Sequence, residues 1–421
     1  MKTIEGYNVR IFTDNIEDSA SEQIKELLSI DVFSKCKIRI MPDVHAGAGC
    51  VIGFTGDLGD KVIPNIVGVD IGCGILVQPF ACKGDIDYHA LNEFILRCIP
   101  SGRNYRDSRY APLPQKYMDV YREAKDIIKQ LRCYRELNET KRLNASIGSL
   151  GGGNHFIELD KDKCGMTYLV VHTGSRNLGK QVAQIYQKLA VKCQSGWAEL
   201  MEEQNRMIAE YKAAGRKDEL QDAIRQLHNS FKMRKPTIPP DLSYLEGVYR
   251  EDYLHDMRLC QQWAKMNRGL IVNLIMDYFI LQGHVEAKPY DLAFESVHNY
   301  IGDDNIIRKG AIAAYEGQKC IIPLNMRDGS LICIGKGNAE WNCSAPHGAG
   351  RIMSRSQAFK TISMDDYRAS MLGIYSESLS EETKDESPMV YKPKDEIIGN
   401  IGDTVSIVNV IKPVYNFKAA E

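Results

Sequence analysis

The sequence predicts an α/β protein in which short buried strands alternate with amphipathic helices. Between residues 37 and 77, apolar stretches of strand length are separated by Gly, Asp and Pro, which is typical of strands joined by tight turns. Residues 166–191 indicate a strand that leads into a helix, and residues 253–279 repeat apolar side chains at helical spacing. The 421 residues are enough for one large domain or two.

Two further helices are predicted from the same periodicity. Residues 114–136 place their apolar side chains on one helical face, and a shorter helix is expected at about 350–361. Residues 376–390, SESLSEETKDESPMV, are polar and acidic. We expect a surface loop there rather than a boundary between domains.

The section from 197 to 235 differs from its surroundings. Apolar and long side chains trace a helical stripe at Trp197, Leu200, Met201, Gln204, Ile208 and Tyr211. Basic residues follow at Lys212, Arg216, Lys217, Arg225, Lys232, Arg234 and Lys235. This pattern predicts a helical hairpin packed on the main body. Its charges have two interpretations, a solvated face or a contact with RNA.

The composition is that of a soluble globular protein, with 44% hydrophobic residues, 26% charged residues and a formal net charge of −2. Such a balance excludes a uniformly basic protein that coats nucleic acid, but it allows a local basic cleft. The N-terminal residues lack the apolar core of a signal peptide, and no run of about 18 apolar residues occurs. The twelve cysteines are scattered. We therefore expect a cytoplasmic protein with reduced thiols and no membrane span.

Six side chains have the chemistry of metal ligands. Four of the nine histidines stand in turns rich in Gly or Ser, and Asp70 and Cys73 share the motif VGVDIGCG; the histidines are His155, His172, His298 and His347. His, Cys and Asp all bind divalent transition metals. Six candidates exceed one tetrahedral shell, which indicates two ions sharing a bridging ligand. These residue types favour zinc, with manganese or cobalt as alternatives, and two ions would suit phosphoryl transfer.

Two glycine-rich segments indicate phosphate binding. In SLGGGNHFIE (149–158), consecutive glycine amides resemble a phosphate cradle, with Asn154 and Glu158 beside His155. In PHGAGRIMSR (346–355), we expect Gly350 to lead into a helix whose N-terminus favours an anion. A neutral His347 there would be a nucleophile towards phosphorus. Basic side chains suited to phosphates, or alternatively to surface ion pairs, are Arg176, Arg308, Lys309, Arg351 and Arg355.

Seven motifs occur in a fixed order along the chain: MPDVHAGAG, VGVDIGCG, GGGNHFIE, VHTGSRNLG, VHNYI, RKGA and HGAGRIMSR. In sequence and order they resemble the RtcB-type RNA ligases, which join 3′-phosphate or 2′,3′-cyclic-phosphate ends of RNA to 5′-hydroxyl ends. The resemblance spans about residues 40–418. It implies one large RtcB-like domain over residues 1–421, with a deep central cleft and residues 197–235 as an inserted helical section.

The resemblance also implies the functional residues. Two Mn²⁺ ions would be held by Asp70, Cys73, His155, His172 and His298, with Cys73 bridging both, and His347 would become guanylylated by GTP. Asp43 and His45 match a motif beside the metal site. The positions that contact the nucleotide would be Asn154, His155, Phe156, Glu158, Ser330, His347, Gly348, Ala349, Gly350, Tyr391 and Lys418, with Glu158 at the guanine. RNA phosphates would be bound by Arg176, Arg308, Lys309 and Arg351.

The implied reaction opens a cyclic phosphate, transfers GMP from His347 to the RNA 3′-phosphate, and lets a 5′-hydroxyl expel GMP. One stretch departs from the family. Where relatives carry a Pro-Gly-Ser-Met turn around the guanylate, this chain reads IPLNMRDGSLICIGKGN. We expect Gly329 and Ser330 to fill that place without the proline.

This departure keeps two alternatives to a ligase open. One is a metal-dependent enzyme that hydrolyses cyclic phosphates without joining ends, and the other is a non-catalytic RNA-binding protein. The expected partner is RNA with broken ends, from tRNA splicing or from nuclease damage. An archease-like activator and a monomeric state are also expected.

Overall fold

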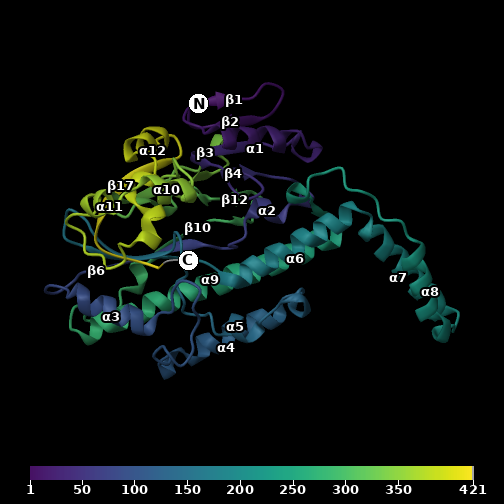
Figure 1. The fold of residues 1–421 in the computed structure, drawn as a ribbon, viewed down its shortest axis with the longest axis horizontal. Coiled ribbons are helices and arrows are strands. Elements are labelled where there is room, and N and C mark those ends of the chain that lie inside the picture. The colour runs from purple at the N-terminus through teal and green to yellow at the C-terminus, as the bar shows by residue number, and fades with distance from the viewer. Residues whose placement is uncertain (420–421) are drawn as a thin grey trace.

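The computed structural model describes residues 1–419, and the body that they form contains two large sheets (Figure 1). The first sheet has the order β1-β2-β3-β4-β12-β11 and is antiparallel except for the parallel β2–β3 pair. Its strands are β1 (Lys2–Thr3), β2 (Val9–Ile11), β3 (Ile38–His45), β4 (Ile52–Gly56), β12 (Ile307–Lys309) and β11 (Tyr300–Ile301).

The second sheet is antiparallel and curls until its two outer strands meet. Its order is β10-β6-β8-β7-β17-β15-β14, and the backbone N–H of Ile321 in β14 donates a hydrogen bond of 3.0 Å to Ser296 Oγ in β10. The strands are β10 (Phe294–Val297), β6 (Gly74–Phe80), β8 (Thr167–Thr173), β7 (Phe156–Lys161), β17 (Val405–Lys418), β15 (Gly329–Gly335) and β14 (Lys319–Asn325). Two short pairs complete the strands, β13 (Ala311–Ala313) with β16 (Ser344–Pro346) and β5 (Lys61–Val62) with β9 (Leu245–Glu246).

Helices surround these sheets. They are α1 (Asp18–Leu28), α2 (Pro64–Val67), α3 (Tyr88–Cys98), α4 (Met118–Gln130), α5 (Thr140–Asn144), α6 (Arg176–Gln194), α7 (Trp197–Ala213), α8 (Leu220–Ser230), α9 (Gly247–Leu281), α10 (Arg355–Thr361), α11 (Met364–Ser370) and α12 (Lys394–Asn400). The mixed α/β class predicted from the sequence is confirmed. No helix within residues 1–419 combines the length and the hydropathy needed to span a bilayer.

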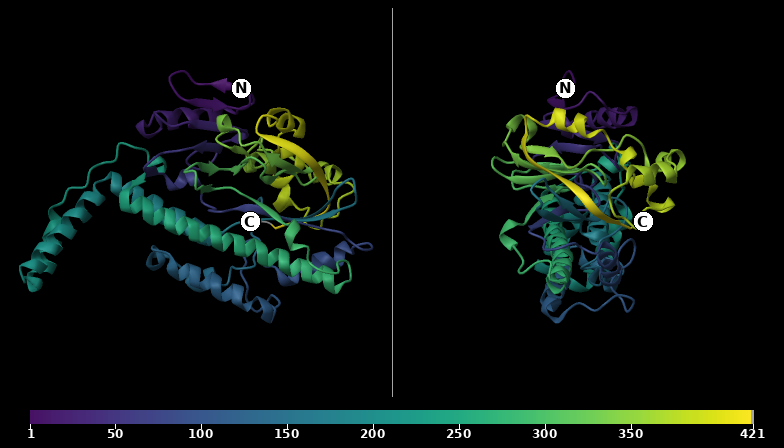
Figure 2. Two further views of the ribbon diagram at one scale, coloured as in Figure 1. Left: turned by 180° about the vertical axis from the view of Figure 1, so that it is seen from behind. Right: turned by 90° about the vertical axis from the view of Figure 1, so that its left-hand side faces the viewer.

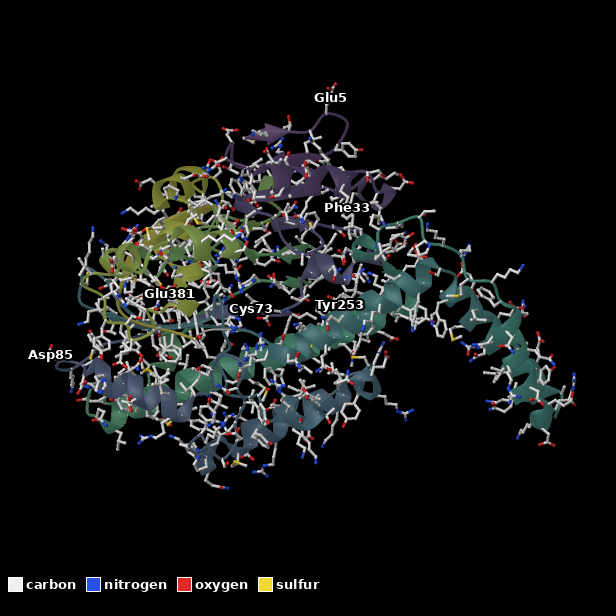
Figure 3. All side chains as sticks on the ribbon, in the orientation of Figure 1. Glu5, Phe33, Cys73, Asp85, Tyr253 and Glu381 are labelled. Carbon is white, nitrogen blue, oxygen red and sulfur yellow. The ribbon has the colours of Figure 1, made fainter. Side chains whose placement is uncertain are left out.

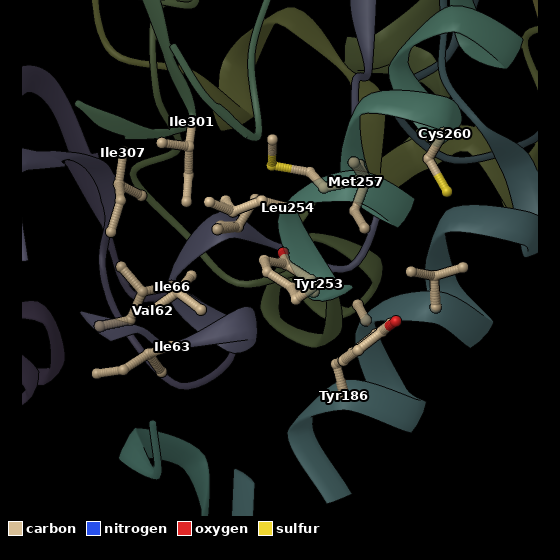
Figure 4. Packing of buried hydrophobic residues seen from close by; sticks show 14 of the residues in the cluster. Val62, Ile63, Ile66, Tyr186, Tyr253, Leu254, Met257, Cys260, Ile301 and Ile307 are labelled. Carbon is tan, nitrogen blue, oxygen red and sulfur yellow. The ribbon is translucent and has the colours of Figure 1, made fainter. Parts of the chain in front are cut away.

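The 35-residue helix α9 runs along the length of the body, between the sheets and the layer formed by α4 and α5 (Figures 1 and 2). One side of α9 buries Ile271 and Phe279 against the second sheet. Nearer its start, Tyr253 and Met257 pack among apolar side chains from α2, α6 and the first sheet (Figure 4). The predicted long helix is thus confirmed, and its burial on several sides matches its apolar composition.

Two predicted helices have different bounds from those expected. The helix predicted over 114–136 ends at Gln130, because Leu131 turns into the core and the Asp256 carboxylate accepts the backbone N–H groups of Arg132 and Cys133 at 2.8 and 3.0 Å. The helix predicted at 350–361 begins only at Arg355, where Ser354 Oγ accepts a hydrogen bond from the backbone of Gln357. Its N-terminus therefore does not lie at Gly350.

Residues 197–235 are helical but do not pack on the main body as predicted. The pair α7–α8 projects away from it (Figures 1 and 2); Leu200 is the only buried residue of α7, and α8 has none. Apart from Leu200 the residues of the predicted stripe are half-buried, and Trp197 and Gln204 contact His228 of α8. The charges are also balanced, with eight basic and seven acidic residues in this section.

Candidate metal and nucleotide site

The motif VGVDIGCG forms the turn between α2 and β6, near the middle of the molecule, where Figure 3 labels Cys73. Gly72 adopts φ +69°, and a Cβ there would come within 2.8 Å of the backbone of Gln261 in α9. Only glycine suits both conditions. This turn places Cys73 directly before β6 and keeps Asp70 within reach of the same cluster of side chains.

Five predicted metal ligands from distant parts of the sequence lie together. Cys73 Sγ is 3.4 Å from His155 Nε2 and 3.3 Å from His172 Nε2, and these three donor atoms lie within 4.8 Å of one another. Asp70 Oδ2 is 3.1 Å from His155 Nε2, and the Nε2 atoms of His172 and His298 are 3.2 Å apart. These five side chains, which we call the Cys/His cluster, thus form one continuous set of donors: a carboxylate, a thiol and three imidazoles.

The protonation of this cluster fits a divalent transition metal. His172 Nδ1 lies 3.0 Å from the carbonyl oxygen of Asn154, which only accepts, so Nδ1 carries the proton and Nε2 presents its lone pair. Burial lowers the pKa of His172 well below its usual value and that of His298 to about 3. The His172 Nε2 lone pair can accept a hydrogen bond from Nε2–H of His298, 3.2 Å away, or bind a cation.

Asp70 and Cys73 differ in their protonation state before a cation binds. Although burial opposes it, the hydrogen bond with His155 and the charge of Arg176 lower the pKa of Asp70, so this carboxylate is ionised. Burial raises the pKa of the Cys73 thiol well above its usual value. Since the thiolate is the metal-binding form, Cys73 needs a bound cation to lose its proton.

His347 is held beside this cluster by Asp43. The buried Asp43 carboxylate accepts from His347 Nδ1 at 2.7 Å and from its backbone N–H at 3.2 Å. The His347 ring is 4.8 Å, centroid to centroid, from that of His298. With the proton fixed on Nδ1, Nε2 of His347 carries the free lone pair. The sequence motif contained Asp43 but did not indicate this contact.

A cavity of about 680 Å³ opens from His347 and His172, within the range of about 300–1,000 Å³ typical of small-molecule sites. Predicted nucleotide positions among its lining residues are Asn154, Phe156, Glu158, His347, Gly348, Ala349, Gly350, Tyr391 and Lys418, and Arg351 lines it too. Burial raises the pKa of Glu158 to about 7, although the charge of Lys418 opposes this.

One wall of the cavity comes from the segment predicted as a surface loop. Glu386, 2% exposed, accepts from Lys418 Nζ at 2.8 Å, from the Tyr391 hydroxyl at 2.6 Å and from Arg351 Nη1 at 3.1 Å. Although burial opposes it, Lys418 and Arg351 lower the pKa of Glu386 to about 2. The prediction of a surface loop is wrong for Glu386 and its neighbours. The acidic local sequence indicates exposure, but Arg351 and Lys418 from other elements neutralise the Glu386 carboxylate and allow its burial.

Ser330 does not line this cavity. It lies fully buried inside β15, paired with Pro323 and Ile411. Residues 323–326 line the cavity instead, beginning with Pro323. The geometry therefore does not support the expectation that Gly329 and Ser330 take the place of the guanylate turn. The cavity wall at this place contains a proline, Pro323, which was not expected.

Three of the four basic residues predicted to bind RNA are engaged elsewhere. Arg308 is buried and forms a bidentate ion pair with Asp304, with Nη1–Oδ1 and Nη2–Oδ2 distances of 3.1 and 2.7 Å. Lys309 is buried too and donates to the carbonyl oxygens of residues 48 and 65. Arg176 donates to Gly102 O at 2.6 Å and to Ser149 Oγ at 3.2 Å. The geometry favours supporting roles for these three, while Arg351 faces the cavity.

Two residues of α9 tie the ligand-bearing loops together. Asn267 accepts from the backbone of Gly148 and Ser149 and donates to the carbonyl oxygens of Ser149 and Gly174. Arg268 donates to the carbonyl oxygens of Gly72 at 2.8 Å and Thr173 at 3.1 Å. The signal for this role is a polar Asn-Arg pair among the buried residues of α9.

Comparison with known proteins gives matches along most of the chain. The profile of the family described as "tRNA-splicing ligase RtcB" matches residues 23–419. The chain belongs to the RtcB family. The predicted resemblance is thereby confirmed over nearly the full length of the chain, and the protein is a member of a family of RNA ligases.

Individual members of the RtcB family align along most of the chain. The RNA-splicing ligase RtcB of Escherichia coli K12 is 28% identical over 439 residues, covering 98% of this chain and 97% of the relative. The tRNA-splicing ligase RtcB of Thermococcus kodakarensis is 25% identical over 458 residues, covering 91% and 87%. That of Pyrobaculum aerophilum is 25% identical over 433 residues, covering 85% and 82%.

Proposed function

We propose that this protein is a GTP- and Mn²⁺-dependent RNA ligase that joins 3′-phosphate or 2′,3′-cyclic-phosphate ends to 5′-hydroxyl ends. The observation that carries the proposal is the place of His347. Its Nδ1 is bound to a buried carboxylate, its ring adjoins the Cys/His cluster, and it lines a cavity of nucleotide size. Membership of the RtcB family supports the same activity.

The proposed covalent step uses His347 Nε2. Nε2 attacks the α-phosphorus of GTP, a nitrogen–phosphorus bond forms, and the bond to the leaving pyrophosphate breaks. Asp43 keeps the proton on Nδ1 and stabilises the positive charge that develops on the ring, as a carboxylate does for a catalytic histidine elsewhere. Asn154 and Glu158 would contact the nucleotide, with Glu158 at the guanine.

Where the RNA end is a cyclic phosphate, water first attacks its phosphorus and the bond to the 2′-oxygen breaks, which leaves a 2′-hydroxyl and a 3′-phosphate. Two transfers then complete the reaction. An oxygen of the RNA 3′-phosphate attacks the phosphorus on His347, and the nitrogen–phosphorus bond breaks. The 5′-hydroxyl oxygen of the second RNA end then attacks the 3′-phosphorus and expels GMP. Asp70, Cys73, His155, His172 and His298 would hold two Mn²⁺ ions, which when bound supply Lewis-acid stabilisation of charge on the phosphate oxygens.

The proposal is tested by incubating the protein with GTP, Mn²⁺ and an RNA that carries a cyclic phosphate and a 5′-hydroxyl. We expect a joined product that disappears when GTP is omitted. Opening of the cyclic phosphate without joining would instead assign the protein to the hydrolytic alternative. Binding of the RNA with neither change would make it a non-catalytic RNA-binding protein.

Replacing Asp43 with Asn is expected to slow formation of the GMP adduct at least about 100-fold while leaving Mn²⁺ binding unchanged. An amide cannot hold the His347 proton on Nδ1 or stabilise the ring cation as a carboxylate does. Adduct formation is measured by intact mass, and metal binding by titration calorimetry. The matched control is Asp304→Asn, which alters a carboxylate paired with Arg308 away from the cavity lining. Equal rates for Asp43→Asn and wild type would contradict the role of Asp43.

The proposal extends to the setting of the protein. Its substrates would be transfer RNA intermediates or RNA cut by nucleases. We place it in the cytoplasm as a monomer that works with an archease-like activator.

A further inference from the structure

One stretch of the chain is far more basic than the rest. Residues 101–145, which we name the basic segment, contain eleven Lys and Arg and only six Asp and Glu, a net charge of +5. The remaining residues contain 42 basic and 49 acidic side chains, a net charge of −7. The near-neutral total therefore hides a strong separation of charge.

The basic segment lies on the outside of the molecule, but one end of it lies next to the Cys/His cluster. Residues 101–117 form an irregular stretch that leads into α4; α4 and α5 follow, and these two helices form the outer layer beyond α9 (Figures 1 and 2). At its start, the Gly102 N–H donates to Gly151 O at 2.9 Å, and Gly102 O accepts from Arg176. Gly151 belongs to the loop that carries His155, so the basic segment begins next to a metal ligand.

Several of its charges have no acidic partner. Within residues 1–419, four exposed basic side chains of the segment have no carboxylate within 4.0 Å; they are Arg103, Lys125, Arg135 and Lys141. Two others pair with a carboxylate, Arg142 with Glu139 and Arg109 with Asp107, and also lie over aromatic rings, at 5.4 Å from the centre of Tyr105 and 5.9 Å from that of Tyr110. Unpaired cations attract phosphates, and aromatic faces stack with unpaired bases.

The projecting hairpin α7–α8 is the rival surface for RNA, and its charges fit less well. Its net charge is +1. Its four arginines are each paired with a carboxylate: Arg206 with Glu203, Arg216 with Glu219, Arg225 with Asp222 and Arg234 with Glu199. Its four lysines are exposed and, within residues 1–419, have no carboxylate within 4.0 Å. The difference from the basic segment lies in the net charge, since seven acidic residues stand among the eight basic ones and leave little net field for a polyanion.

We propose that the basic segment is the surface on which the RNA backbone docks, with the strand leading from α4 and α5 along residues 101–106 to the metal cluster. This inference rests on the proposed function for its choice of partner. It assigns the docking to a surface that none of the seven sequence motifs includes. The hairpin α7–α8 is left without a role in holding the RNA near the site.

The test reverses three charges on each surface. One variant is Lys125→Glu, Arg135→Glu, Lys141→Glu; its matched control is Lys212→Glu, Lys217→Glu, Lys232→Glu in the hairpin, where all three lysines are likewise exposed. Binding of a short single-stranded RNA with a 3′-phosphate is measured by fluorescence anisotropy over a range of salt concentrations. Thermal melting checks that both variants fold, and the corresponding Gln variants replace either one that does not.

We expect the basic-segment variant to bind RNA at least about tenfold more weakly and to reduce the slope of log K against log salt by about 2, since each lost phosphate contact removes about 0.7 for a single strand. The hairpin control should match wild type. Equal losses in both variants, a loss in the hairpin alone, or no loss in either would overturn the proposal. GMP transfer to His347 in the absence of RNA is measured on the same proteins. It should be normal in all of them, and its failure in wild type would count against the proposed function instead.

Discussion

Replacing His347 with Ala is expected to abolish the covalent GMP adduct, with a loss of at least about 10³-fold in its rate of formation. His347 is the one histidine that combines a position on the cavity wall with a carboxylate fixing its proton on Nδ1. The neighbouring imidazole of His298 is turned to the Cys/His cluster and cannot take over the attack. Protein incubated with GTP and Mn²⁺ is analysed by intact mass and peptide mapping.

The control for this variant is His89→Ala, which removes an exposed histidine of α3 that pairs with Glu377. It should form the adduct at the wild-type rate. Mn²⁺ binding by His347→Ala should stay within about twofold of wild type. His347 is hydrogen-bonded to Asp43, which is not one of the predicted metal ligands. An adduct that persists in His347→Ala, or one mapped to another residue of the wild-type protein, would refute the nucleophile.

Replacing Cys73 with Ser is expected to weaken Mn²⁺ binding at least about 100-fold and to remove one of two bound ions. The Cys73 sulfur lies 3.3–3.4 Å from Nε2 of His155 and of His172, so it could bind a cation together with both imidazoles. A serine hydroxyl has nearly the same size but stays protonated and binds metals weakly. The number of ions and their affinity are measured by titration calorimetry.

The control for the thiol is Cys320→Ser, because Cys320 is equally buried but lies in a purely apolar cluster. Cys320→Ser should lower the melting temperature and keep both ions. Cys73→Ser should lose the increase in melting temperature that Mn²⁺ gives the wild-type protein, since only a ligand that binds the folded state stabilises it. Two ions bound with unchanged affinity in Cys73→Ser would show that the thiol is only a packing residue.

Much of the site could be predicted because its ligands are carried by short glycine-rich turns. In VGVDIGCG and GGGNHFIE the glycines allow tight turns, and the Asp, Cys and His side chains project from these turns. Residue type and spacing are therefore informative about the site. The structure then brings Asp70, Cys73, His155, His172 and His298 into one cluster. Asp43 was visible only as part of a motif, because its partner His347 is 304 positions away.

Charged segments were predicted least well. The acidic stretch 376–390 was expected to be exposed, yet Glu386 is buried among Arg351, Tyr391 and Lys418, which come from other elements. The basic residues of 197–235 left two interpretations open, a solvated face or an RNA contact; in the structure the four arginines of this section pair with carboxylates of the same section. A list of charges along the chain does not indicate which of them meet an opposite charge in space.

The sequence by itself determined the α/β class, the long central helix, the family and the chemistry of the ligands, since these depend on periodicity and on residue types within a few positions of one another. Only the tertiary structure decided which residues support the site: Asp43 behind His347, Asn267 and Arg268 beneath the ligand loops, and Glu386 in the cavity wall. Each of these acts through hydrogen bonds to residues far away in the chain. Such contacts form when the sheets and α9 pack together, and the local sequence carries almost no trace of them.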